Sequence, residues 1–163
     1  MINPKAFYAL SYGLYIVASK KEERINGQTA NTVFQISNDP STIAISINKG
    51  NLTREFIQES GRFTVSVLAQ DTPLSLIGKF GFRTGREVDK FAGFTYKTTA
   101  NGLPYLIDHA LAFFEAGVIQ ETDAGTHIIF IGEIAEAEVL QEGVPMTYAY
   151  YQQAKRGGAP PAP

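Results

Sequence analysis

The sequence predicts a mostly β protein, an antiparallel barrel with a few peripheral helices. Runs in which apolar and polar residues alternate recur along the chain, and a period of two is typical of half-buried strands. Turns that contain glycine separate these runs, and only a few short stretches have helical spacing. A closed antiparallel barrel also leaves few strand edges exposed to solvent.

The predicted strands follow one another from near the N-terminus. In the run 42–47, three isoleucines alternate with small residues, and a similar alternation marks the other strands. The last two strands form a long hairpin, because a segment rich in turn formers, Glu121–Gly125, separates them. The expected strands are Leu14–Ser19, Ala30–Ser37, Thr42–Ile47, Phe63–Leu68, Leu111–Gln120 and His127–Val139.

The predicted helices are few and short. Asn51 is the expected N-cap of a helix over Leu52–Ser60, whose apolar residues form one stripe. Gly61 follows at the position where a left-handed residue ends a helix. Three further short elements are expected, at Pro4–Leu10, at Leu74–Phe80 after a proline, and at Met146–Lys155.

Length and composition predict one folded unit. The chain has 163 residues, 44% of them hydrophobic, and a formal charge of −2, which does not favour nucleic-acid or anionic-membrane binding. It has no apolar run long enough to cross a membrane and no signal-peptide pattern, so a cytoplasmic location is expected. We expect a domain over residues 1–153 and a Gly/Pro/Ala-rich linker or tail over 154–163.

The absence of cysteine excludes several kinds of chemistry. It rules out disulfides, iron–sulfur clusters, thiol nucleophiles and zinc held by cysteine. With only two histidines, His109 and His127, an all-protein metal site is not expected. Any redox chemistry would therefore depend on a bound organic cofactor.

The segment Ile43–Leu68 contains the first candidate site. It is expected to form a strand, a polar turn, a short helix and another strand, with Asn48, Lys49 and Asn51 in the turn and Thr53 in the first helical turn. A helix start carries unpaired backbone N–H groups and the positive end of the helix dipole, so this segment suits a phosphate. The alternative is an ordinary capped helix beside a solvated lysine.

Two further segments are candidates. Arg24–Thr32 contains Asn26-Gly27, a turn signal. The small polar residues that follow could approach the edge of a flavin ring. The alternative interpretation of this segment is a plain hairpin turn. Lys79–Phe91 has two arginines, two lysines and two glycines without clear periodicity. It could present several donors to an anion, or it could be a mobile basic surface loop.

No catalytic side chain can be assigned from the sequence. Neither histidine lies in a nucleophile motif, so a hydrolytic triad is not supported. The acidic residues of 133–138 alternate with apolar ones and fit a solvated strand face. Neither a GxGxxG motif after a strand nor a GxxxxGK motif occurs, so a Rossmann or P-loop nucleotide site is not supported either.

The motifs INGQTANTVFQIS, PSTIAISINKGNLTREFIQESGRFTVSVLAQD, GREVDKFAGF and THIIFIGEIAEAEVL occur in this order. Together they resemble the flavin reductase-like, FMN-binding split β-barrel family, over about residues 5–152. Within that family the chain is most similar to the flavoredoxin and ferric-reductase branch and to the flavoprotein half of high-molecular-weight rubredoxin. In the latter a rubredoxin module follows a linker, and the tail RGGAPPAP has linker composition.

The resemblance implies a homodimer of split barrels with FMN near the subunit interface. It implies electron transfer from NADH or NADPH through FMN to a partner such as rubredoxin or a flavodiiron protein. Two alternatives remain: a flavin reductase that releases free reduced flavin to a monooxygenase, and a non-catalytic FMN-binding or interaction module. No nucleic acid and no membrane is expected as a partner.

The resemblance also implies site residues. The chemistry belongs to FMN, so no catalytic side chain is expected; His127 is a candidate nicotinamide contact, although its triplet is Gly-Thr-His where some relatives have Gly-Asp-His. The expected FMN contacts fall into four groups along the chain. They are Gln28, Thr29, Ala30, Asn31 and Thr32 at the ring and ribityl chain; Asn48, Lys49, Asn51 and Thr53 at the phosphate; Ser66, Val67 and Leu68 in the ring pocket; and Arg83, Thr84, Gly85 and Lys90 closing over the phosphate or ribityl side.

Overall fold

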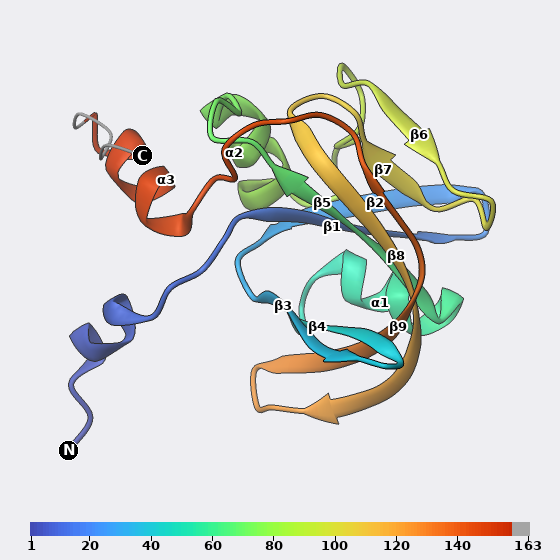
Figure 1. Ribbon diagram of the computed structural model, residues 1–163, viewed down its shortest axis with the longest axis horizontal. Helices are drawn as coiled ribbons and strands as arrows, with labels where there is room; N and C mark the ends of the chain where they lie inside the picture. Colours follow the sequence, from blue (N-terminus) through green and yellow to red (C-terminus); the bar gives the residue numbers. More distant parts are fainter. Residues whose placement is uncertain (158–163) are drawn as a thin grey trace.

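A computed structural model describes residues 1–157 and consists of a curved antiparallel sheet with short helices around it (Figure 1). Seven strands lie in the order β2-β1-β5-β8-β9-β4-β3, and a two-stranded ribbon, β6-β7, lies beside them. The strands are β1 (Tyr15–Lys21), β2 (Arg24–Ala30), β3 (Val33–Asn38), β4 (Ser41–Asn48), β5 (Arg62–Leu68), β6 (Tyr96–Thr98), β7 (Pro104–Leu106), β8 (Ala110–Asp123) and β9 (His127–Val139). The helices are the 3-10 helix η1 (Pro4–Ala9), α1 (Leu52–Ser60), α2 (Leu74–Phe82) and α3 (Tyr148–Lys155).

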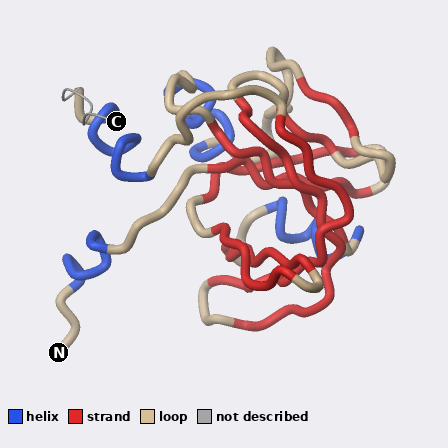
Figure 2. The backbone as a smooth tube through the Cα atoms, in the orientation of Figure 1, coloured by secondary structure: helices blue, strands red, loops and turns tan. Residues whose placement is uncertain are grey.

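The two edge strands of the sheet, β2 and β3, are consecutive in the chain. Only Asn31 and Thr32 separate them, so the sheet has to curl until its edges meet at this corner, as Figure 2 shows. The Ser46 backbone N–H donates to the Thr32 carbonyl oxygen at 3.2 Å and fixes the corner to β4. The two edge strands are not hydrogen-bonded neighbours in the sheet.

Two apolar clusters stabilise the fold. One fills the inside of the curled sheet, where Phe63, Phe130 and Ile57 of α1 are fully buried. The other packs α2 and α3 against the outside of β1 and β5, around Phe80 and Leu76. Each such side chain contributes roughly 1.5–3 kcal/mol by its burial, so α1 and α2 are held firmly on either side of β2.

The prediction of a mostly β, antiparallel fold with peripheral helices is confirmed. The long C-terminal hairpin is present and extends further than expected, because β8 continues to Asp123 and only residues 124–126 form the turn. Helix α1 has the predicted bounds, and Gly61 ends it in the left-handed region at φ 68°. Helix α2 begins as predicted and continues to Phe82.

The predicted turn at Asn26-Gly27 is wrong. Both residues lie inside β2, and the β1–β2 turn consists of Glu22 and Glu23 instead. Gly27 is needed for space: a Cβ there would lie 3.2 Å from the Ala18 Cβ and 3.3 Å from the ring of Phe80. The dipeptide therefore marks the close approach of α2 to the sheet, which sequence alone cannot distinguish from a turn.

One expected strand begins three residues later than predicted. Ala30 ends β2, and the following strand begins only at Val33, because the chain turns the corner at residues 31–32. The short ribbon β6-β7 was not predicted, since three residues are too few to show a period.

The two ends of the described chain lie on the same side of the molecule (Figure 1). Tyr12, between η1 and β1, meets Tyr148 of α3 edge-to-face, with ring centroids 6.2 Å apart. Helix α3 reaches Lys155, two residues past the expected domain boundary, and residues 158–163 of the expected tail lie outside the described residues. Among the helices of residues 1–157, none has the length and apolarity needed to cross a membrane.

Candidate functional site

A groove runs along the edge strand β2. It consists of two pockets of about 340 Å³ each, which share Gln28, Thr29, Asn51 and Phe82 among their lining residues and are therefore continuous. We call the part beside the start of helix α1 the α1 end, and the part beneath helix α3 the α3 end. Together they have the size of a small-molecule site.

At the α1 end, the start of helix α1 has no side-chain cap. Asn51 occupies the N-cap position but makes no capping hydrogen bond. Its amide instead donates to the Gln28 Oε1 at 3.0 Å, across the groove. Asn51 is therefore at the predicted N-cap position, but its side chain does not make the predicted capping hydrogen bond. Gly50, Leu52 and Thr53 all line the α1 end, so the positive end of the helix dipole faces it.

The same end contains a buried lysine. The Lys90 side chain is only 6% exposed, and its Nζ donates to the Phe80 carbonyl oxygen at 2.9 Å. Within residues 1–157 no carboxylate forms an ion pair with it. Burial lowers the pKa of Lys90 to about 8. A buried ammonium without a counter-charge is unfavourable by itself, so this end of the groove is suited to an anion.

Lys49 lies elsewhere, although it was the lysine expected at the phosphate. Its Nζ forms an ion pair with the Asp123 Oδ2 at 2.7 Å, at the exposed tip of the β8–β9 hairpin. Its carbonyl oxygen accepts two hydrogen bonds from the Arg54 guanidinium, at 2.9 and 2.7 Å. Lys49 lines neither pocket. In this structure Lys49 therefore lies outside the groove, and its contact with a phosphate stays a prediction.

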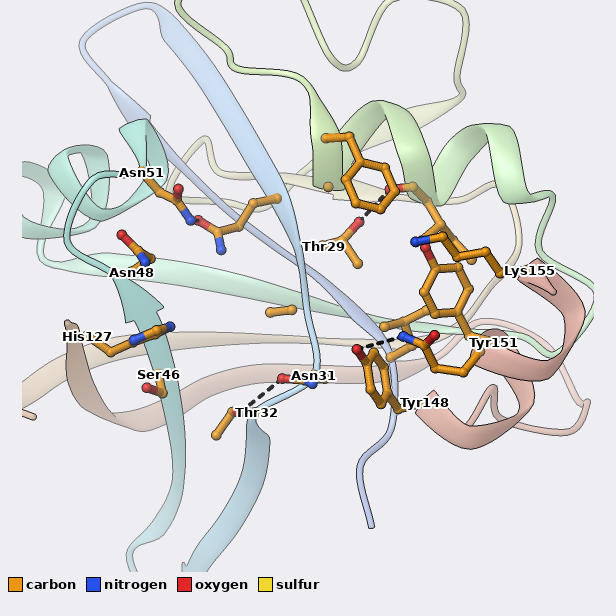
Figure 3. A pocket seen from close by; sticks show the side chains of 17 residues that line it. Thr29, Asn31, Thr32, Ser46, Asn48, Asn51, His127, Tyr148, Tyr151 and Lys155 are labelled. Atoms are coloured by element: carbon orange, nitrogen blue, oxygen red, sulfur yellow. Dashed lines mark hydrogen bonds between the residues drawn. The ribbon is translucent and has the colours of Figure 1, made fainter. Parts of the chain in front are cut away.

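The α3 end has a polar side and an aromatic side. Figure 3 shows Ser46, Asn48 and His127 on one side of the pocket and the side chains of α3 on the other. The Tyr148 hydroxyl accepts a hydrogen bond from Gln152 at 2.7 Å, which orients its ring. A slot of this kind can hold a flat heteroaromatic ring, whose faces need apolar contact and whose edge needs hydrogen bonds.

His127 is the one histidine of the groove. It opens β9 opposite Asn48 of β4, and its Nδ1 lies 2.8 Å from the Thr126 Oγ1. His127 lines the α3 end of the groove and does not line the α1 end.

The structure brings most of the predicted site residues together. Those that line the groove are Gln28, Thr29, Ala30, Asn31, Thr32, Asn48, Asn51, Thr53, Arg83, Thr84, Gly85, Lys90 and His127. Besides Lys49, three predicted residues of β5 do not. Ser66 is buried and its Oγ accepts from the Leu106 N–H at 3.0 Å, Leu68 belongs to the apolar core, and Val67 lies between β1 and β8. Because β1 separates β5 from β2, these three side chains are not brought to the groove of a single chain.

Several lining residues were not predicted. Asn26 was missed because Asn-Gly was taken as a turn, and Phe82 because α2 was expected to stop at Phe80. The tyrosines of the C-terminal helix were seen, but nothing in the sequence indicated that this helix covers a groove. The lining residues outside the predicted set are Leu14, Asn26, Ser46, Gly50, Leu52, Ile77, Phe80, Gly81, Phe82, Glu87, Tyr148, Tyr151, Gln152 and Lys155.

Comparison with known proteins shows the family of this chain. The sequence model of one protein family, the flavin reductase like domain, matches residues 7–159. The chain belongs to the flavin reductase-like family. It is 62% identical over 159 residues to a high molecular weight rubredoxin of Moorella thermoacetica, covering 98% of this chain and 69% of that protein. It is 49% identical to a ferric-chelate reductase (NAD(P)H) of Archaeoglobus fulgidus, covering 98% of this chain and 94% of that protein.

Solved structures in the family have the same fold. The flavin reductase PheA2 in its native state superposes with a TM-score of 0.76 at 27% identity, over 90% of this chain and 93% of that chain. The resemblance inferred from the sequence motifs is thereby confirmed at the level of family and fold.

Proposed function

We propose that this protein is an FMN-containing oxidoreductase that passes electrons from NADH or NADPH to an acceptor protein. Membership of the flavin reductase-like family supports a flavin. The name of the Archaeoglobus relative supports a nicotinamide donor. The name of the Moorella relative supports rubredoxin as an acceptor, and similarity to putative diflavin flavoproteins of Nostoc (31% identity, 24% of their length) supports a flavodiiron-type partner.

The buried Lys90 beside the uncapped start of α1 is the observation that carries this proposal. A phosphate at the α1 end would meet the Lys90 ammonium and the backbone N–H groups of the α1 start. The Thr53 hydroxyl, which accepts from Asn26 at 2.8 Å, keeps its own proton for the same phosphate oxygens. The residues present therefore fit the phosphate of FMN, with Lys90 as the lysine that contacts it.

The α3 end fits the remainder of the cofactor. Residues 30–32 turn the corner between β2 and β3 and offer backbone groups and small polar side chains to a ring edge. Tyr148 and Tyr151 supply apolar contact from the other side. When bound, FMN supplies hydride acceptance and one-electron transfer. The protein's own part is to orient the reactants and exclude water, which needs no acid or base side chain.

Two further parts of the proposal concern assembly and location. We include a homodimer, because η1 stands away from the sheet with Phe7, Tyr8 and Leu10 exposed and so offers apolar surface to a second copy. Analytical ultracentrifugation of the purified protein tests it, and a monomer at micromolar concentration would contradict it. A cytoplasmic location is also part of the proposal.

The function is tested by anaerobic spectroscopy of the FMN-loaded protein. Addition of NADH or NADPH should remove the yellow flavin absorbance, and subsequent addition of oxidised rubredoxin should restore it. A flavin that stays oxidised with both nucleotides would contradict the enzymatic function. Rapid loss of FMN to a gel-filtration column would favour the alternative in which free reduced flavin is released.

A further inference from the structure

Buried side chains line one side of the α1 end of the groove. The side chains behind Lys90 are those of Asn26, Thr53 and Phe80, which are 3%, 1% and 0% exposed. The Asn26 Nδ2 donates to the Thr53 Oγ1 at 2.8 Å and ties β2 to the first turn of α1. We call the pair Asn26 and Thr53 the end wall. An anion that reaches the Lys90 ammonium lies against this wall.

The loop of residues 83–90 closes the same end from the other side. Its glycine, Gly85, lies directly against the end wall. A Cβ on Gly85 would be 2.0 Å from the Asn26 Oδ1 and 2.6 Å from the Asn26 Cγ, distances that real side chains do not tolerate. The φ angle of Gly85 is not positive, so glycine is needed here for space and not for backbone conformation.

An ion pair fastens this loop to helix α1. The Arg86 Nη2 lies 2.5 Å from the Glu55 Oε1, and the hydrogen bond from Arg86 lowers the pKa of Glu55. The Arg86 backbone N–H donates to the Thr84 Oγ1 at 3.2 Å, which stabilises the turn of the loop. Loop, end wall and helix start thus enclose the position beside Lys90 on three sides.

We propose that this enclosure selects a terminal phosphate monoester, so that the protein takes FMN and rejects FAD, with Gly85 as a specificity-determining residue. The inference rests on the proposed function. The phosphate of FMN ends the molecule, so it can fill a closed end. The corresponding phosphate of FAD continues into a second phosphate and an adenosine, which would have to pass where the end wall and Gly85 meet.

The test is isothermal titration of flavin-free protein with FMN and with FAD. The unmodified protein should bind FMN at least about 100-fold more tightly than FAD. Gly85→Ala should push the loop off Asn26, weaken FMN about tenfold and leave FAD unchanged or tighter, so that the affinity ratio falls.

Two surface substitutions provide a matched pair. Arg86→Met releases the loop from α1 and should lower the FMN-to-FAD ratio. Lys21→Met breaks a similar exposed ion pair at the other end of the same helix, with Glu59 at 3.1 Å, and should leave the ratio unchanged.

The outcomes separate this inference from the proposed function. Equal affinity of the unmodified protein for FMN and FAD would overturn the inference and leave the function standing. An unchanged ratio in Gly85→Ala would overturn the role of that residue. Binding of neither flavin would contradict the proposed function itself.

Discussion

Two lysines were expected near the phosphate, and their surroundings in the structure differ: one is paired with a carboxylate and the other is buried without one. Lys49 is exposed, and Asp123 satisfies its charge in the free protein. Lys90 is buried in the groove, with only the Phe80 carbonyl oxygen as a hydrogen-bond partner among the described residues. A cation that already has a carboxylate gains little from a ligand, whereas one that is buried without a carboxylate gains much. The comparison therefore supports the proposed anion site beside Lys90.

The largest expected effect concerns FMN affinity. Lys90→Met should weaken FMN binding about 100-fold, because it removes a buried, charge-assisted contact worth roughly 2–3 kcal/mol. Lys49→Met, the matched control, should change the affinity less than about twofold. Fluorescence titration of FMN into flavin-free protein measures both. A large loss with Lys49→Met would reverse the comparison.

The second effect is on the pH dependence of binding. Below the Lys90 pKa of about 8 the ammonium is already charged in the free protein, so FMN affinity should be flat. Above that pH the free protein has lost the proton and must take it up again on binding, so affinity should fall by up to about tenfold per pH unit. Titrations between pH 6.5 and about 9.5 follow this. A Lys90→Met variant that keeps the same slope would show that another group is responsible.

The third effect is on stability without flavin. The pKa of Lys90 is lower in the folded protein than the unfolded value of about 10.4. Below about pH 8 the buried Lys90 is charged, and its charge lowers the free energy of unfolding. This cost disappears as the pH rises from about 8 to about 10.4, where the unfolded chain binds more protons than the folded one. Lys90→Met should therefore raise the free energy of unfolding at pH 7 by about 2 kcal/mol. Urea denaturation of the flavin-free proteins measures it; a destabilised variant would mean that Lys90 is already paired.

The smallest effect is expected in the Lys49 region. Lys49→Met removes an exposed ion pair at a hairpin tip, and such pairs contribute little in water. The melting temperature should shift by less than about 2 °C, and added salt should make the shift smaller. Differential scanning calorimetry would detect a larger change, which would indicate that the hairpin tip matters for the fold.

Most of the fold was predictable because its strands are long and alternate regularly. Strand β4, with isoleucines at every second position, and the β8–β9 hairpin both have this pattern. Helix α1 was predictable from its apolar stripe and from Gly61. Strand β2 was not, because Asn26-Gly27 has the composition of a turn and only the packing of Phe80 explains the glycine.

The candidate site was predictable in its parts but not in its geometry. The start of α1 and the basic loop were both recognised, yet sequence alone could not show that the loop folds over the helix start. Two lysines were therefore candidates, and the choice between them depends on whether a carboxylate already pairs with the lysine, as Asp123 does with Lys49. Asp123 pairs with Lys49 because the register of the β8–β9 hairpin brings together two residues that are 74 positions apart in the sequence.

The most direct measurement compares FMN with riboflavin, which lacks the phosphate, in the unmodified protein and in the two lysine variants. The account predicts that the preference for FMN over riboflavin is strong in the unmodified protein and in Lys49→Met, and is nearly lost in Lys90→Met. A preference that survives in Lys90→Met and disappears in Lys49→Met would contradict it.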